Sequence, residues 1–200
     1  MAAVAVRNSN HFGTCMYYTL MGAAQEQWFT EGLTRSTKRW KLVAQSTQMS
    51  SSGINTPLGR SAFTDGWDGY PQARARLLGS VAQAGLKDVV VLGGDVHMNV
   101  AAQLRVQAND EKSPIVASEL VTTSITSRGL GEKLLAQIRD SNPDILHARS
   151  DERGYTLLEV KPQGIRAQFR TTPNPAKADG VLSTQAQFRI QAGVAGVQKA

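Results

Sequence analysis

The stretch KDVVVLGGDVH, residues 87–97, carries the strongest indication of the fold. Its apolar run, residues 89–92, is short and rich in valine, which is typical of a strand buried on both faces of a sheet. The glycine pair Gly93 and Gly94 then allows the backbone to turn tightly and to approach a ligand closely. We therefore predict a buried strand that ends in a tight turn at the glycines.

The residues before this strand have the pattern of a helix. Pro71 can begin it, because the N–H that proline lacks has no partner in the first turn of a helix. Leu77, Leu78 and Val81 recur at helical spacing, and Gly85 is suited to end the helix in a left-handed conformation. Helix, tight turn and buried strand form an α/β unit, in which sites lie at the carboxyl ends of the strands.

The remaining sequence predicts further helices and strands within one domain over residues 1–200. Residues 23–33 indicate a short amphipathic helix, and residues 39–46 a strand buried on both faces. Residues 46–66 are rich in Ser, Gly, Thr and Asn and predict a long loop, while residues 1–21 predict irregular structure. Further elements are predicted as strands at 99–106, 114–121, 153–160, 163–170 and 185–193, and as a helix at 130–140. The last three strands alternate apolar and polar residues, which favours an antiparallel meander.

The composition is that of a globular protein with a surplus of positive charge. Hydrophobic residues make up 41% of the 200 residues, charged residues 19%, and the formal net charge is +6. The charge is spread along the chain, which is typical of a solvated basic surface and also suits an anionic ligand such as a phosphate ester. The chain has no Lys/Arg-rich tract with interleaved aromatic residues, so a dedicated nucleic-acid partner is not expected.

Other classes of protein lack their signatures in this sequence. No apolar run is long enough to cross a bilayer, so no membrane association is expected, and the first residues do not have the pattern of a signal peptide. Cys15 is the one cysteine, so the chain offers no internal disulfide and no CxxC zinc site. Neither a P-loop nor a G-x-S-x-G motif occurs, which leaves nucleotide-binding and serine-hydrolase interpretations without support.

Asp95 and His97 are the strongest candidates for metal ligands. They follow the glycine pair directly, and residues at i and i+2 can face one ion when the turn is irregular. A carboxylate oxygen and an imidazole would then share the ion. The alternative is that Asp95 caps the turn and His97 packs against the protein or faces solvent.

Two further segments contain residues that could contact a substrate. Trp67, Asp68 and Tyr70 lie just before the predicted helix, and Arg74 and Arg76 lie in its first turns, so together they could shape an anion pocket. In the alternative interpretation Asp68 caps the helix, the aromatic residues pack, and the arginines are solvated. The second segment, residues 122–127, follows a strand and is rich in hydroxyls, which could bind phosphate oxygens or form a plain polar loop.

The order of these segments resembles the PhoD-like alkaline phosphatases, a family of calcineurin-like metallophosphoesterases. The matching stretches span residues 22–160 and are GAAQEQWF, RWKLVAQS, DGWDGYPQARARLL, VVVLGGDVH, SELVTTSITS, SNPD and RGYTLLEV. The resemblance implies an α/β fold, here part of a four-layer α/β/β/α metallophosphoesterase sandwich. It also implies a phosphoric ester hydrolase in which metal-bound hydroxide attacks phosphorus in line.

Specific roles follow from the same resemblance. Asp95 and His97 are expected to be catalytic metal ligands, with calcium and iron as the metals of the family. The residues expected to border the substrate are Trp67, Asp68, Tyr70, Arg74, Thr123 and Ser124. Family members are usually exported, so a periplasmic or secreted location is expected.

The resemblance further implies metal ligands that would precede residue 1. We therefore expect the chain to be the C-terminal part of such an enzyme, separated from the N-terminal half of the domain and inactive by itself. Asp144 stands where the family usually has a histidine, His147 is displaced from that position, and Cys15 lies outside the family's cysteine motif. The alternative hypothesis is a non-catalytic module with the same partial fold that binds phosphate or a polyanion.

Overall fold

The centre of the molecule is a five-stranded mixed sheet. The computed structural model describes residues 5–7, 19–173, 175–177 and 180–200. The strands, in spatial order, are β2 (Lys41–Ala44), β5 (Val89–Gly93), β7 (Ile115–Val121), β6 (Asn99–Arg105) and β8 (Ile145–Arg149). β2, β5 and β7 run parallel, whereas β6 is antiparallel to both of its neighbours. The carboxyl ends of the three parallel strands therefore meet at one edge of the sheet.

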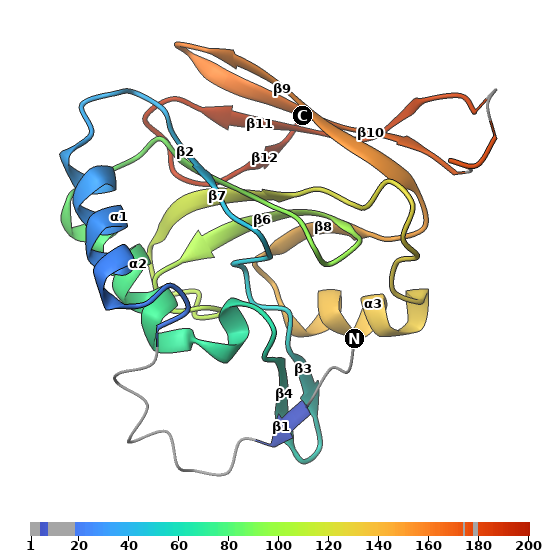
Figure 1. Cartoon of the computed structure of the whole chain (residues 1–200), viewed down its shortest axis with the longest axis horizontal. Coiled ribbons are helices and arrows are strands. Elements are labelled where there is room, and N and C mark those ends of the chain that lie inside the picture. The colour runs from blue at the N-terminus through green and yellow to red at the C-terminus, as the bar shows by residue number, and fades with distance from the viewer. Residues whose placement is uncertain (1–4, 8–18, 174, 178–179) are drawn as a thin grey trace.

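A second, antiparallel sheet is stacked on this one (Figure 1). Its strands are β9 (Arg153–Lys161), β10 (Gly164–Thr172), β11 (Ser183–Gln191) and β12 (Gln198–Lys199), which are adjacent in chain order. The predicted meander is thus confirmed. Apolar residues from both sheets, among them Val90, Leu120, Phe169 and Phe188, form the core between them.

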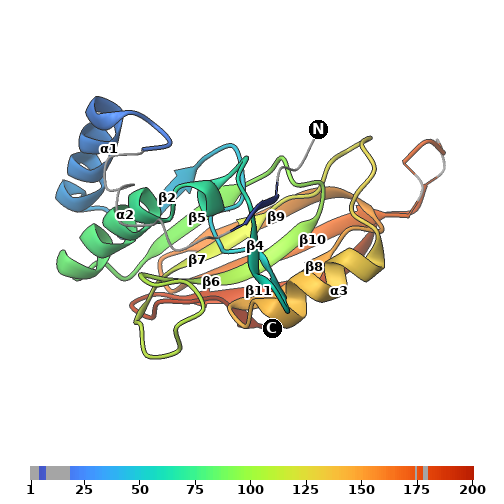
Figure 2. The same cartoon turned by 90° about the horizontal axis from the view of Figure 1, so that it is seen from below.

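Helices cover the opposite face of the five-stranded sheet (Figures 1 and 2). They are α1 (Ala23–Arg35), α2 (Pro71–Gln83) and α3 (Glu132–Ser141). Successive residues of a strand point to opposite faces, so Val89 and Val91 pack toward Leu77 and Leu78 of α2 while Val90 packs toward the second sheet. The predicted α/β fold is confirmed, and the described residues form three layers, helix, sheet and sheet, of the expected four.

A small hairpin interrupts the segment that was expected to be a loop. β3 (Ile54–Thr56) and β4 (Gly59–Phe63) pair antiparallel, and β1 (Ala5–Arg7) pairs with β4 on its other side. The prediction of a continuous loop over residues 46–66 is therefore wrong, because these short strands are partly exposed and lack a clear apolar alternation. Irregular structure over residues 1–21 is likewise wrong at β1, while residues 1–4 and 8–18, including Cys15, lie outside the described residues.

The first predicted strand of the sheet is present but less buried than expected. β2 lies at the edge of the sheet, where Val43 is its buried residue and Leu42 is 46% exposed. Burial on both faces was the wrong expectation, because apolar composition does not distinguish an edge strand from a central one. β8 was not predicted as a strand, since its polar residues His147 and Arg149 break the apolar run.

Candidate functional site

Three loops meet at the carboxyl edge of the parallel strands. They comprise residues 45–52 after β2, residues 94–98 after β5 and residues 122–128 after β7. Backbone hydrogen bonds extend the sheet into them: the Gln45 N–H donates to the Leu92 carbonyl and the Thr122 N–H to the Gly93 carbonyl, each at 3.0 Å. This is the position at which α/β sheets carry ligand sites.

The turn after β5 has an unusual backbone. Asp95 (φ 67°) and His97 (φ 56°) both adopt the left-handed conformation, which is uncommon for residues other than glycine. Such strain is concentrated at functional sites. The Asp95 side chain is exposed, and His97 is partly exposed beside it.

The ring of His97 is oriented by the third loop. Its Nδ1 lies 2.9 Å from the carbonyl oxygen of Arg128, and because a carbonyl can only accept, Nδ1 carries the proton. In the neutral ring the lone pair is then on Nε2. A histidine that binds a metal commonly has this arrangement, in which the second nitrogen donates to a backbone carbonyl.

The described residues supply only part of a metal site. Within residues 5–7, 19–173, 175–177 and 180–200, no group of three or more His, Cys, Asp or Glu side chains could hold an ion. A catalytic metal such as zinc generally takes three protein ligands and keeps a further position open. Asp95 and His97 are two suitable donors, so the described residues fall short of a full site.

Asp95 lines a cavity of about 230 Å³ between the first two loops, the segment after β4, and α3. The polar residues that line the cavity are Thr47, Gln48, Ser50, Ser52, Asp65, Asp68 and Asp95. Its apolar residues are Phe63, Trp67, Val96, Met98, Leu130 and Ile138. The cavity brings together three of the predicted site residues, Trp67, Asp68 and Asp95, but not His97.

The loop of residues 45–52 is fixed by a buried carboxylate. Glu119 of β7 is fully buried and accepts hydrogen bonds from the Met49 N–H at 2.5 Å and the Ser50 N–H at 2.8 Å. Burial raises the pKa of Glu119, although these hydrogen bonds and the charge of Arg74 act in the opposite direction.

Arg74 holds the same loop from α2. It is 4% exposed, and its guanidinium donates to the carbonyl oxygens of Met49 at 2.8 Å and Arg105 at 3.1 Å. The interpretation that Arg74 is solvated is therefore wrong. A role in substrate binding stays a prediction, and the two bonds to backbone carbonyls favour a positioning role.

The other predicted site residues before α2 make hydrogen bonds or packing contacts within the protein. Trp67 is 3% exposed and its indole N–H donates to Gln45 Oε1 at 3.2 Å, while Tyr70 packs against the helical core. The Asp68 carboxylate accepts the Ser52 N–H at 2.9 Å. Asp68 does not cap α2, whose N-cap position is Tyr70, with no side-chain cap bond.

Thr123 and Ser124 lie outside the cavity that Asp95 lines. The buried Thr123 donates its N–H to Asn99 Oδ1 at 2.9 Å, and its hydroxyl accepts from Arg153 at 3.0 Å. The Ser124 hydroxyl donates to the Ser127 carbonyl at 2.6 Å. Their predicted contact with substrate stays a prediction.

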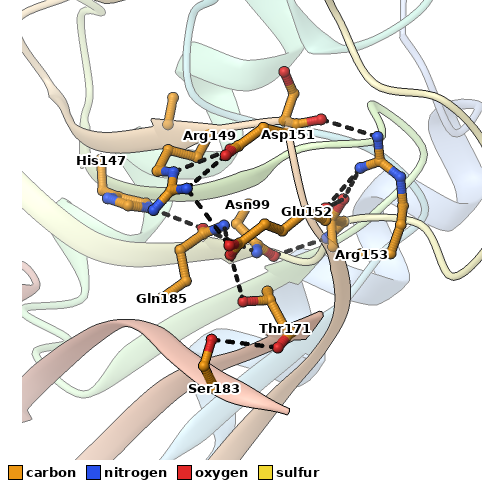
Figure 3. Close-up of polar contacts among 12 residues, drawn as sticks. Asn99, His147, Arg149, Asp151, Glu152, Arg153, Thr171, Ser183 and Gln185 are labelled. Atoms are coloured by element: carbon orange, nitrogen blue, oxygen red, sulfur yellow. Dashed lines mark hydrogen bonds and ion pairs between the residues drawn. The ribbon is translucent and has the colours of Figure 1, made fainter. Parts of the chain in front are cut away.

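A polar network between the two sheets supports this region (Figure 3). Asn99 Nδ2 donates to Gln185 Oε1 at 3.2 Å, and Gln185 Nε2 donates to the Glu152 carboxylate at 2.9 Å, which also accepts the Thr171 hydroxyl at 2.6 Å. His147 Nε2 lies 3.2 Å from the same Gln185 oxygen. The network ties β6, which begins two residues after His97, to the second sheet.

His147 and Asp144 have structural surroundings. The His147 ring packs against both Phe169 and Phe188, with its centroid 5.7 Å from each of theirs, and burial lowers its pKa. The buried Asp144 pairs with Arg105 at 2.7 Å. Neither residue lines the cavity that contains Asp95.

Sequence patterns missed several residues that line the cavity or support the loops and strands around it. Glu119 stands in an otherwise apolar strand, PIVASELV, and a charged residue in such a run is a signal for a buried functional or structural role. Asn99, Gln185 and Gln48 gave no comparable signal. The partners of Asn99 and Gln185 come from other elements, and Gln48, which bonds to Ser50 of its own loop, is placed at the cavity only by the assembled fold.

None of the helices among the described residues is long and apolar enough to span a membrane.

Known proteins resemble this chain over most of its length. A family model described as PhoD-like phosphatase matches residues 9–169. Alkaline phosphatase D of Bacillus subtilis (strain 168) is 36% identical over 184 residues, which cover 90% of this chain and 31% of that protein. A solved structure titled "Structure of PhoD" superposes with a TM-score of 0.84 at 33% identity, covering 92% of this chain and 36% of that one.

The chain thus spans about a third of the length of these relatives. Because the family model covers more than half of the sequence, the expectation drawn from the quoted motifs is confirmed at the level of the family. The chain belongs to the PhoD-like phosphatase family.

Proposed function

We propose that this chain carries one wall of the active site of a phosphoric ester hydrolase. The family supports the reaction class, and the position of Asp95 and His97 at the carboxyl edge of the parallel strands supports the location of the site. The observation that carries the proposal is the His97 ring, whose Nδ1 donates to Arg128 and whose Nε2 lone pair is thereby available.

In this proposal Asp95 and His97 each give one ligand to the metals that the family uses, for which calcium and iron are the expected ions. When bound, such metals lower the pKa of water and stabilise charge on the phosphoryl oxygens. The remaining ligands would come from the part of the domain that the relatives contain and this chain does not match. We accordingly propose that the chain alone does not turn over phosphate esters, and that the complete enzyme acts outside the cytoplasm.

A chimera tests the proposal directly. In it, this chain replaces the matched 31% of alkaline phosphatase D of Bacillus subtilis, and turnover of a chromogenic phosphate monoester is measured with calcium and iron(III). We expect the chimera to be active and the isolated chain to be inactive. In the chimera, His97→Ala and Asp95→Ala should each lower kcat/KM by about 100-fold or more, since even changes behind a metal ligand cost 10–100-fold.

Matched controls separate a lost ligand from lost stability. His147→Gln removes the other described histidine, and Asp110→Ala removes an exposed carboxylate that does not line the cavity. Both should retain most of the activity of the chimera. Equal losses in the control and ligand variants, or full activity of His97→Ala, would contradict the proposal. A well-folded chimera without turnover that still binds inorganic phosphate would favour the alternative of a non-catalytic phosphate-binding module.

A further inference from the structure

Gln48 presents a buried acceptor for which the described residues provide no donor. Its side chain is on the wall of the 230 Å³ cavity, and the residue is 4% exposed. Nε2 donates to the Ser50 hydroxyl at 2.9 Å, but Oε1 is buried without a hydrogen-bond partner in the described part of the chain. A buried polar atom of this kind indicates a ligand or solvent partner.

The backbone on either side of Gln48 is held firmly. Glu119 accepts the next two N–H groups, those of Met49 and Ser50, and Arg74 donates to the Met49 carbonyl. On the other side, the Thr47 carbonyl packs directly on Gly93, where an added Cβ would collide with it. The backbone that carries the Gln48 side chain is therefore held in place at the cavity wall.

The cavity has the opposite charge to the chain as a whole. Three carboxylates line it, those of Asp65, Asp68 and Asp95, whereas its lining contains no Lys, Arg or His. The chain carries a net charge of +6. Without a bound metal, these carboxylates repel an anion such as phosphate and attract a cation that donates hydrogen bonds, while the charges of Arg60 and Arg74, outside the lining, act on Asp68.

The apolar wall distinguishes an organic cation from a metal ion. Nearly half of the lining residues are apolar or aromatic: Phe63, Val96, Met98, Leu130, Ile138 and Trp67. A hydrated metal ion makes no favourable contact with such side chains. In the described part of the chain, no three His, Cys, Asp or Glu side chains are placed to hold a metal. An alkylammonium group suits both parts of the lining. Its N–H groups can donate hydrogen bonds to the oxygens, and its carbons can pack against the apolar and aromatic side chains.

We propose that this cavity binds an alkylammonium group, with Gln48 Oε1 as a hydrogen-bond acceptor and Asp65 and Asp68 as the countercharges. Binding of a free ammonium compound does not depend on catalysis. A second step rests on the proposed function: a phosphate ester held at Asp95 would then direct an amino-alcohol portion into the cavity. The substrate class would be phosphate monoesters or diesters of amino alcohols.

A titration with n-propylammonium chloride tests binding on the chain itself. The probe signal is the indole N–H of Trp67 in ¹H–¹⁵N NMR spectra, assigned with Trp28→Phe and Trp40→Phe, because Trp67 lines the cavity and the other two tryptophans do not. We expect saturable shifts with n-propylammonium and none with n-propanol, its neutral analogue. Equal shifts with n-propanol, or equal shifts with sodium chloride at the same ionic strength, would overturn the proposal.

Two variants and a matched control locate the site. Gln48→Leu and Asp65→Asn should each weaken n-propylammonium binding about tenfold, the loss expected for a hydrogen bond or ion pair to a charged group. Glu159→Gln removes one carboxylate from β9, outside the cavity, and should bind as the wild type does. Asp65 is exposed, so Asp65→Asn keeps the test decisive even if Gln48→Leu does not fold. Unchanged affinity in a folded Asp65→Asn variant would refute the assignment.

The substrate class is tested separately in the chimera. The ratio of kcat/KM for phosphoethanolamine to that for n-propyl phosphate should exceed about tenfold and fall toward one in Asp65→Asn. A ratio of one in the original chimera would reject the amino-alcohol step while leaving the binding site in place. A chimera that hydrolyses neither ester would instead count against the proposed function, and the NMR titration would still decide the cation site.

Discussion

The loop of residues 45–52 and the turn of residues 94–98 border the same cavity but are held in place differently. The loop depends on distant residues, because Glu119 of β7 and Arg74 of α2 provide the partners of its backbone. The turn follows from its own sequence, in which a glycine pair ends β5 and leads into two residues with left-handed backbone. One wall is thus set by tertiary contacts and the other by local conformation at a strained position.

The largest expected effect follows from removing the support of the loop. Glu119→Ala leaves two buried N–H groups without an acceptor and removes one of the three carboxylates whose charges act on Arg74, so we expect a loss of about 3–5 kcal/mol in the free energy of unfolding. Urea denaturation measures it. Glu132→Ala, which removes an exposed carboxylate of α3, is the control and should change the value by less than about 0.5 kcal/mol. Similar values for both variants would show that the loop does not depend on Glu119.

A double-mutant cycle sharpens the same point. Arg74→Met and Glu119→Gln act on two groups that share the Met49 peptide units, so their effects should not add. We expect the double variant to be more stable than the sum of the single losses by about 1–2 kcal/mol, again from urea denaturation. Strict additivity would mean that the two residues support the loop independently.

A substitution in the turn of residues 94–98 should raise the free energy of unfolding instead of lowering it. Asp95→Gly relieves the left-handed backbone at an exposed position, so we expect a gain of about 0.5–1 kcal/mol in the free energy of unfolding. In the chimera the same change should abolish turnover, because it removes a proposed ligand. Asp110→Gly is the matched control: its backbone is not left-handed, so a loss of stability is expected there. A destabilised Asp95→Gly variant would show that the carboxylate stabilises the turn.

The smallest effect concerns the pH dependence of the network behind the turn. Burial lowers the pKa of His147 in the folded protein below its ordinary value of 6.5. The unfolded chain therefore binds more protons in the window just below 6.5, and stability should fall as the pH drops through it. Thermal unfolding between pH 7.5 and 5.5 should show this slope in the wild type and a shallower one in His147→Gln. Identical slopes would exclude His147 as the source.

Sequence reasoning identified the elements with strong local signals. The helix from Pro71, the strand ending at Gly93 and the antiparallel strands after Arg153 are all present, because apolar periodicity and glycine or proline at their ends specify them. It failed where burial is set by neighbours. The sequence predicts a loop where the β3–β4 hairpin forms, and it predicts burial on both faces for β2, which lies at the edge of the sheet.

The residues of the candidate site likewise fall into those that a local motif identifies and those that only the fold identifies. Asp95 and His97 were identified from a motif, and they lie at the carboxyl edge of the parallel strands, as the α/β unit predicts. Gln48, Glu119 and Asn99 were not identified. Glu119 and Asn99 each acquire their role from a partner at least 20 positions away in the sequence, and no spacing rule connects such residues. Gln48 bonds to Ser50 of its own loop, and only the fold places it at the cavity.

By itself, the sequence determined the family, the α/β class and the turn with its two candidate ligands, because these depend on local patterns and on the order of motifs. Only the tertiary structure decided which side chains surround the cavity and what charge it has. A formal charge of +6 suggested an anionic ligand, whereas the fold gathers Asp65, Asp68 and Asp95 around one cavity without a basic residue in its lining. Net charge is a sum over the chain, but a ligand is bound by the few groups that folding brings within a few ångströms of it.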